Sequence, residues 1–209
     1  MRQEINFEAI KNFFGETLET YGPTPLGANW NSETSQELRF EQLVKLCDRT
    51  RPFTIIDFGC GYGALFNFLT VRGYTVTYTG YDLLESMVEK AQGLFKERAN
   101  CAFTMHLEEL QTADYVVSSG IFNIRFQYTQ DTWTEYVLET LHKMNDLSSK
   151  GLSFNMLTKY SDADHMRPHL YYADPGFLFD YCKTHFAKNI ALLHDYDLYD
   201  FTILVKKQL

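Results

Sequence analysis

One stretch of the sequence, residues 54–69 with the letters TIIDFGCGYGALFNFL, restricts the fold more than any other. An apolar, β-branched run over 53–58 follows Arg51-Pro52 and has the length of a buried parallel strand. Glycines then occupy alternate positions, and apolar residues at helical spacing follow them. The pattern predicts a strand, a tight glycine turn and a helix, in which N–H groups at the helix start face a ligand.

The spacing of the three glycines separates two kinds of nucleotide site. Gly59, Gly61 and Gly63 follow G-x-G-x-G, whereas dinucleotide-binding turns follow G-x-G-x-x-G. Asp57 precedes them, and a carboxylate there disfavours a pyrophosphate but favours a cationic or amine-bearing ligand. A generic nucleotide turn or a purely structural turn is the alternative.

The turn also matches a known family motif. It fits D-x-G-x-G-x-G without a gap and resembles the first motif of the class I S-adenosylmethionine (SAM)-dependent methyltransferases. The resemblance covers residues 53–122 closely and the remainder as architecture. It implies SAM as the cofactor and S-adenosylhomocysteine as the product. The residues to which it assigns SAM binding are Asp57, Gly59, Cys60, Gly61, Tyr62 and Gly63.

A second acidic residue ends the next predicted strand. Residues 74–81 alternate β-branched and aromatic side chains, and Asp82 follows them before a predicted helix over 83–98. A carboxylate at this strand tip can accept hydrogen bonds from both ribose hydroxyls, and the resemblance implies this role for Asp82, with Leu83 beside it. A capping box, Asp82-x-x-Glu85, is the structural alternative, and both roles can hold at once.

The resemblance further suggests contacts to adenine and to the methyl group. A short predicted strand over 102–105 precedes the adenine candidates His106 and Leu107. The predicted strand 114–118 leads to the residues expected beside the methyl group, which are Ser118, Ser119 and Gly120. The D/N-P-P-Y/F pattern of methyltransferases that act on planar amines is missing there. No acidic cluster suits a catechol-type Mg²⁺ site, so we expect no metal.

The remaining elements complete an α/β fold. The further predicted elements are helices over 3–20, 32–48 and 133–147, and strands over 151–157, 190–194 and 200–205. The resemblance implies one doubly wound domain over residues 1–209, with helices on both faces of a seven-stranded, mostly parallel sheet. The expected strand order is 3-2-1-4-5-7-6, with the last strand antiparallel.

Two segments are expected to close the acceptor pocket. The N-terminal helices, residues 1–50, would cover the cofactor, with Tyr21 and Trp30 as a substrate wall or as an aromatic plug between helices. The loop 158–173 follows a strand at its carboxyl end, where ligands bind in open α/β sheets.

The polar residues of that loop suggest roles in binding and catalysis. Arg167 of the loop can dock a carboxylate or phosphate, as can Arg125, which follows the predicted strand 114–118 and could face the loop. His165 and His169 are the candidate catalytic bases for a hydroxyl acceptor. The further candidates for acceptor contacts in the loop are Tyr171 and Tyr172. The alternative is that these groups only tie down a long loop.

Charge and composition limit the partners. The net charge of −8, without a Lys/Arg run, argues against nucleic acid. No apolar run is long enough to span a membrane, and no signal-peptide pattern opens the sequence. Four cysteines without C-x-x-C spacing suggest reduced thiols and a cytoplasmic location. The sequence leaves the oligomeric state open.

The function predicted from these features is SAM-dependent methyl transfer to a small molecule. The preferred reaction is O-methylation of a small anionic metabolite or a sugar building block. The alternatives are an N-methyltransferase that acts on an amino sugar or small amine, and a non-catalytic SAM-binding partner protein. A dehydrogenase is a weaker alternative, because the glycine spacing and the length argue against it.

Overall fold

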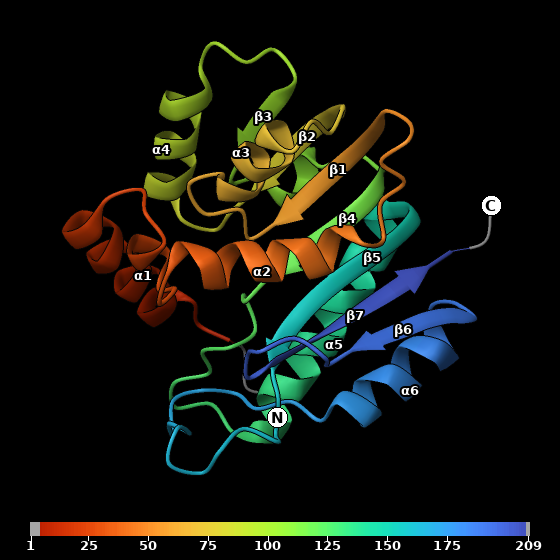
Figure 1. Cartoon of the computed structure of the whole chain (residues 1–209). Coiled ribbons are helices and arrows are strands. Elements are labelled where there is room, and N and C mark those ends of the chain that lie inside the picture. Colours follow the sequence, from red (N-terminus) through yellow and green to blue (C-terminus); the bar gives the residue numbers. More distant parts are fainter. Residues whose placement is uncertain (1–4, 208–209) are drawn as a thin grey trace.

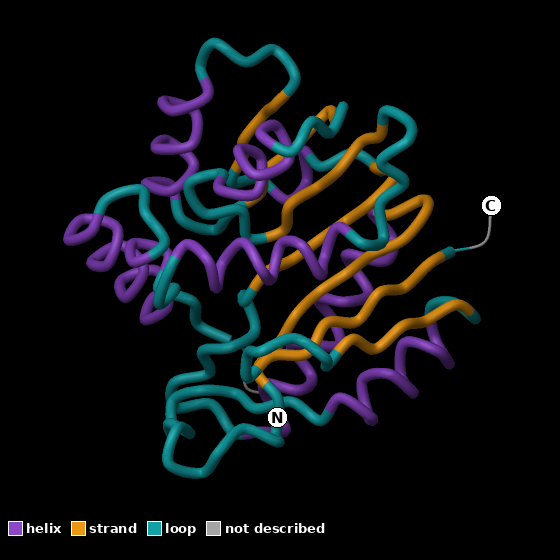
Figure 2. Tube along the Cα trace, viewed as in Figure 1, coloured by secondary structure: helices purple, strands orange, loops and turns teal. Residues whose placement is uncertain are grey.

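A seven-stranded sheet forms the centre of the computed structural model, which describes residues 5–207 (Figures 1 and 2). Its strand order is β3-β2-β1-β4-β5-β7-β6, and β7 runs antiparallel to both of its neighbours. The strands are β1 (Phe53–Phe58), β2 (Val76–Tyr81), β3 (Cys101–Thr104), β4 (Ala113–Ser119), β5 (Ser148–Leu157), β6 (Asn189–Leu193) and β7 (Asp200–Lys206). The predicted fold class and strand order are therefore confirmed.

Helices cover both faces of the sheet (Figure 1). The α-helices are α1 (Glu8–Tyr21), α2 (Glu33–Val44), α3 (Ala64–Val71), α4 (Glu85–Phe95), α5 (Gln130–Leu147) and α6 (Pro175–His185). Two short 3₁₀ helices are η1 (Leu26–Ala28) and η2 (Leu107–Glu109). Within the described residues, no helix combines the length and the apolar composition that crossing a membrane requires.

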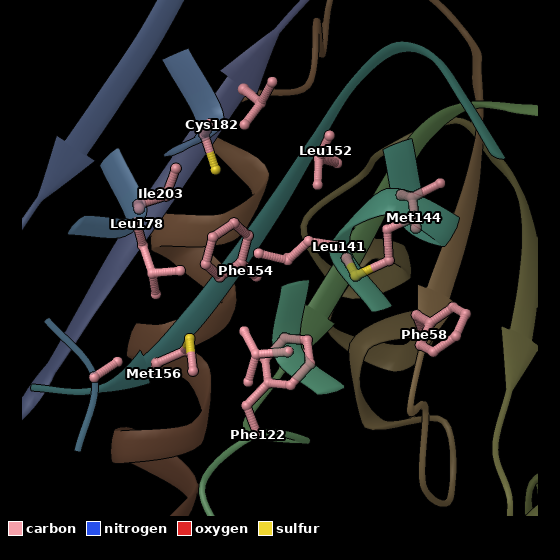
Figure 3. Packing of buried hydrophobic residues seen from close by; sticks show 14 of the residues in the cluster. Phe58, Phe122, Leu141, Met144, Leu152, Phe154, Met156, Leu178, Cys182 and Ile203 are labelled. Carbon is pink, nitrogen blue, oxygen red and sulfur yellow. The ribbon is translucent and has the colours of Figure 1, made fainter. Parts of the chain in front are cut away.

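The core has two layers because side chains alternate across each strand. In β4, Val116 belongs to the layer that includes residues of α5 and α6, while Tyr115 and Val117 belong to the layer that includes residues of α2 and α3 on the other face. Figure 3 shows part of the first layer, where Leu141 of α5 lies close to Phe154 of β5. These two layers hold the strand ends rigidly, and the strand ends carry the site.

Side-chain caps explain where several helices begin. Ser32 accepts a hydrogen bond from the Ser35 N–H at 3.1 Å and starts α2, in line with the sequence prediction. Asp174 caps α6 in the same way, with Pro175 in the first turn. The alternative prediction of a capping box at Asp82 is wrong, because α4 begins after Leu84 and has no side-chain cap.

Some predicted boundaries shift. Strand β5 begins at Ser148, directly after α5, because Ser148 already pairs with Ala113 of β4. Helix α1 begins at Glu8, and the first residues of the predicted helix, 3–4, lie outside the described residues. In Figure 1 the tip of β1 points toward α1 and the start of α2, so α1 and the first turns of α2 lie at the carboxyl edge of the sheet, while the rest of α2 crosses a face of the sheet.

Candidate functional site

A cavity of about 800 Å³ lies at the carboxyl ends of β1, β2 and β4. Its walls come from the N-terminal helices, the glycine turn after β1, the ends of β2 and β4, and α5. This volume falls in the range of sites for small molecules and cofactors. The position agrees with the rule that ligands bind at the carboxyl edge of a doubly wound sheet.

The glycine turn is built for close approach to a ligand. Gly59, Gly61 and Gly63 all have positive φ, at +87°, +52° and +84°. A Cβ on Gly59 would lie 2.1 Å from Cγ2 of Ile121. Gly59 and Gly61 line the cavity together with Cys60 and Tyr62. Gly63 does not line it, and starts α3 where a Cβ would press on Phe95, so its role is packing.

Replacing Gly59 with alanine should therefore disrupt the site. The positive φ costs an L-residue about 1–2 kcal/mol, and the clash with Ile121 adds to it. We expect Gly59→Ala to lower the free energy of unfolding by about 2 kcal/mol or more, measured in urea. Gly93→Ala in α4, where nothing lies within 4 Å of an added Cβ, is the control and should be neutral or stabilising. Equal free energies of unfolding for Gly59→Ala and Gly93→Ala would contradict the conclusion that the turn requires glycine at position 59.

Asp82, directly after β2, links the end of β2 to the glycine turn that follows β1. Its Oδ2 accepts the Gly61 N–H at 2.8 Å, and its Oδ1 accepts the Leu84 N–H at 2.9 Å. Burial raises the pKa of this carboxyl, and the backbone N–H groups oppose the rise. These contacts do not use all the acceptor sites of the carboxylate, so it can still accept a hydrogen bond from a ligand.

Asp57 lies deeper in the cavity wall, at the end of β1. It is 3% exposed, and its Oδ2 accepts a hydrogen bond from the Tyr78 hydroxyl at 2.7 Å. Burial raises the pKa of Asp57 to about 7, with a smaller contribution from the charge of Asp82 and an opposing one from Tyr78. A cationic ligand in the cavity would favour the ionised form of this carboxyl.

The remaining candidates for cofactor contacts divide into two groups. The residues that line the cavity are Leu83, Leu107, Ser119 and Gly120. Ser118 is fully buried behind the wall and donates its hydroxyl to the Phe58 carbonyl at 2.7 Å. His106 is exposed, 3.6 Å from Glu108, and does not line the cavity. We therefore exclude Ser118 and His106 from the candidate site.

The N-terminal segment forms the opposite wall. Trp30 lies over the end of β4, since a Cβ on Gly120 would be 2.4 Å from Cη2 of the Trp30 ring. The same ring packs against the guanidinium of Arg39, whose carbon is 4.3 Å from the ring centroid. Lys11 and Phe14 of α1 line the cavity beside them. Tyr21 does not: it is 51% exposed at the end of α1.

The loop 158–173 contributes little to the cavity, in contrast to the expectation from the sequence. Of this loop, Leu170 lines the wall. Isolated bridges pair Thr158 with Ala173 and Ile124 with Leu170, and these pairs fix the two ends of the loop to the rest of the protein. Its polar groups mainly hold the loop together, which is the alternative stated above.

The arginines and histidines predicted to contact the acceptor lie outside the lining. Arg125 donates Nε to the Leu170 carbonyl at 3.1 Å, and Arg167 donates to the Asp164 carbonyl at 2.8 Å. His165 is exposed beside Tyr199, and His169 is exposed. The structure therefore gives these four side chains no place in the candidate site.

The two loop tyrosines have structural contacts as well. Tyr171 is buried in the core, with its hydroxyl 2.8 Å from the Thr134 hydroxyl. The hydroxyl of Tyr172 accepts the Arg167 N–H at 2.9 Å. Neither tyrosine lines the cavity.

One wall was missed at the sequence level. A face of α5 lines the cavity with Thr132, Glu135, Tyr136, Glu139, Thr140 and Lys143. These positions recur every three or four residues, so they share one face of the helix. The spacing was readable in the sequence, but nothing in it indicated that this face turns toward a cavity. Arg39 and Asn123 were missed for the same reason.

Comparisons with known proteins agree with this geometry. The profile of a family described as "Methyltransferase domain" matches residues 55–146. A methyltransferase homologue from Mycobacterium tuberculosis (strain ATCC 25618 / H37Rv), Rv1506c, is 48% identical over 164 residues, which are 78% of this chain and 99% of that protein. The chain belongs to the class I SAM-dependent methyltransferases.

Solved structures share the fold of this methyltransferase at low sequence identity. The N-methyltransferase NodS from Bradyrhizobium japonicum WM9, in complex with S-adenosylhomocysteine, has a TM-score of 0.64 and 12% identity, covering 94% of this chain and 97% of that chain. Magnesium protoporphyrin IX methyltransferase from Synechocystis PCC 6803, with bound SAM, has a TM-score of 0.56 and 14% identity. The match covers 100% of this chain and 87% of that chain. At this identity the likeness concerns the fold alone.

Proposed function

We propose that this methyltransferase transfers the methyl group of SAM to an oxygen of a small polar acceptor, a sugar building block or a small anionic metabolite. One observation carries the proposal. One cavity is lined both by the glycine turn with Asp82 and by amides, aromatic rings and cations. A cofactor and a small acceptor can therefore lie in contact within this cavity.

The residues at the cofactor end fit SAM. The turn leaves no side chain at Gly59 and Gly61, Asp82 presents carboxylate oxygens for ribose hydroxyls, and Leu83 and Leu107 offer apolar contacts. SAM supplies an electrophilic methyl group on a sulfonium. The chain's own contribution is to bind and orient both reactants, an effect worth up to roughly 7–11 kcal/mol in favourable cases.

The acceptor end suits a molecule with hydroxyl groups. Amide side chains both donate and accept hydrogen bonds, as hydroxyls do, and the lining amides are Asn29, Asn31, Gln36 and Asn123. Trp30 adds a flat apolar face next to them. Lys11 also lines the cavity and supports an acceptor with an anionic group, whereas Arg39, which lines it too, is paired with the buried Asp200.

N-methylation is the second candidate, and one observation favours it. Glu135 and Glu139 of α5 line the cavity, and carboxylates there would attract an acceptor amine. A small-molecule acceptor suits both O-methylation and N-methylation.

The location we propose is cytoplasmic. All four cysteines are free thiols, as is usual in a reducing compartment.

The reaction can be tested with SAM that carries a radioactive methyl group. The panel contains monosaccharides, sugar phosphates, small carboxylic acids and amino sugars, and SAM affinity is measured in parallel by calorimetry. We expect the radioactive methyl group on an oxygen of the acceptor. Treatment with base then distinguishes the two kinds of product: a methyl ether keeps its label, whereas a methyl ester releases it as methanol. Label only on amino nitrogen would support N-methylation instead. Tight SAM binding without any transfer would contradict the proposal and favour a non-catalytic SAM-binding protein.

A further inference from the structure

Asn123 lies just beyond the end of β4, and its side-chain amide has one defined orientation. Its Oδ1 accepts the Leu157 N–H at 3.1 Å, so a flipped amide would place two N–H groups against each other. The backbone is held as well, because its N–H donates to the Gly120 carbonyl at 3.2 Å and its carbonyl accepts the Tyr171 N–H at 2.8 Å. The amide nitrogen, Nδ2, is therefore fixed in position.

This nitrogen is a hydrogen-bond donor that a ligand in the cavity can reach. Asn123 lines the cavity. Within residues 5–207, Nδ2 donates to no other group, and it is not one of the unpartnered side-chain atoms without accessible surface. A Cβ on Gly120 would lie 3.5 Å from Nδ2 and 2.4 Å from the Trp30 ring. The donor therefore lies beside Trp30 at the end of β4, where we expect the acceptor to meet the methyl group.

A second amide, which is fully buried, fixes the same strand end. Asn155 of β5 accepts the Gly120 N–H on Oδ1 at 2.9 Å and donates Nδ2 to Ser119 Oγ at 3.2 Å. Because Ser119 accepts this hydrogen bond, its own O–H can be donated to a ligand, and Ser119 lines the cavity. The end of β4 therefore offers two donors, and an oxygen of a ligand can accept them.

The charged groups of the lining allow an anion at this place. Lys11 of α1 and Lys143 of α5 line the cavity, and both can offset a negative charge. Two of the four acids in the lining lie at the cofactor end, and the two acids on α5 have interaction partners of their own. The four acids are Asp57, Asp82, Glu135 and Glu139.

The supply of bases also bears on the acceptor. A hydroxyl must lose its proton when it attacks a methyl group, and histidine is the commonest base for this step. Within residues 5–207 no histidine lines the cavity, and the two predicted bases, His165 and His169, lie outside it. A carboxylate is already ionised at neutral pH and needs no base. The lining therefore favours a carboxylate as the group that is methylated.

We propose that the acceptor is a small carboxylic acid, such as a sugar acid, and that the Asn123 Nδ2–H binds the carboxylate that becomes a methyl ester. The inference rests on the proposed function and selects one of the oxygens that it allows. One carboxylate oxygen accepts the N–H of Asn123, while the other forms the bond to the methyl carbon as the bond from that carbon to sulfur breaks. The electron pair stays on sulfur, so the products are the methyl ester and S-adenosylhomocysteine, and no proton is released.

Acetate is a probe that tests this contact without a known acceptor. It is titrated at constant ionic strength into the protein saturated with S-adenosylhomocysteine, and NMR follows the side-chain NH₂ signals of Asn123. The loss of these signals in Asn123→Asp identifies them. We expect them to shift with acetate, with saturation in the millimolar range, and to stay in place with ethanol. No shift with acetate, or an equal shift with ethanol, would overturn the binding of a carboxylate by Asn123.

Asn123→Asp tests the same contact in the reaction. The variant keeps an oxygen for the Leu157 N–H but replaces the donor with a negative charge, which repels a carboxylate. D-glucuronate and D-glucose are compared first, because they differ only in a carboxylate and a hydroxymethyl group, and L-lactate is the smaller acid. We expect a base-labile methyl ester on an acid and none on glucose. The variant should lose about 10-fold or more in kcat/KM for that acid, while its SAM affinity is not weakened.

Asn6→Asp is the matched control. Asn6 Oδ1 also accepts a backbone N–H, from Glu8 at 2.9 Å, but Asn6 does not line the cavity. This variant should keep the kinetics of the wild type. Equal losses in Asn6→Asp and Asn123→Asp, unchanged kinetics in Asn123→Asp, or a methyl ether as the product would each overturn the inference. Absence of transfer to every compound of the panel would instead count against the proposed function, and the acetate titration would still decide whether Asn123 binds a carboxylate.

Discussion

Asp82→Ala should weaken SAM binding by at least about 100-fold while the protein stays folded. The two hydrogen bonds that a ribose can donate to this carboxylate are worth roughly 1.5–3 kcal/mol each, because the acceptor is charged. The variant also releases the N–H groups of Gly61 and Leu84, which Asp82 holds at 2.8 and 2.9 Å. Calorimetric titration with SAM, alongside urea denaturation, separates the loss of affinity from any loss of stability.

Asp114→Ala is a matched control for this change. Asp114 also accepts a backbone N–H, from Thr54 at 3.1 Å, and pairs with Lys150 at 3.0 Å. It lies near the amino ends of β1 and β4, away from the cavity. The control should keep the SAM affinity of the wild type. Unchanged affinity in Asp82→Ala, or the same loss in both variants, would show that Asp82 does not contact the cofactor.

The cofactor end of the site could be anticipated because its signals are local. A positive φ requires glycine at three alternate positions of the turn, and the strand before it and the helix after it are visible in the apolar pattern. Asp82 stands at the end of the next strand, so the parallel register of β1 and β2 brings it to the turn. The sheet order was implied by the resemblance to the class I methyltransferases and is confirmed.

The acceptor end could not be read in this way. The two histidines and the one arginine of residues 158–173 suggested a site by their chemistry, but the position of a loop depends on pairing far along the chain. Here the pairs of Thr158 with Ala173 and of Ile124 with Leu170 decide it. Arg39 reaches the cavity wall through Asp200, a partner that no local pattern reveals.

The same limit applies to Asp57. Its position in the motif was clear from the sequence, but its environment was not. The contact with Tyr78 and the closeness of Asp82 arise only when β1 and β2 pair. These contacts and the burial together give this acid a pKa of about 7 and make the behaviour of the site depend on pH.

Asp57→Asn should stabilise the protein at pH 8 and change little near pH 4. The pKa of Asp57 is raised from 3.8 to about 7 in the folded state, so the folded protein keeps a proton that the unfolded chain releases. Stability therefore falls as the pH rises from about 4 to about 7, and the loss is complete above 7. A shift of about 3 units corresponds to at most about 4 kcal/mol, and asparagine, which does not ionise, avoids it.

Urea denaturation of wild type and variant at pH 4.5 and 8, each buffered to about the same ionic strength, measures this difference directly. Asparagine can still accept the hydrogen bond of the Tyr78 hydroxyl, so the comparison isolates the charge.

The same charge should favour a sulfonium in the cavity, so the SAM affinity of the wild type should rise through pH 7 while that of Asp57→Asn stays level. Tyr78→Phe removes the hydrogen bond that lowers this pKa, and should move the transition to higher pH. A stability difference between wild type and Asp57→Asn that is the same at both pH values would contradict a raised pKa, because only titration of Asp57 makes that difference depend on pH.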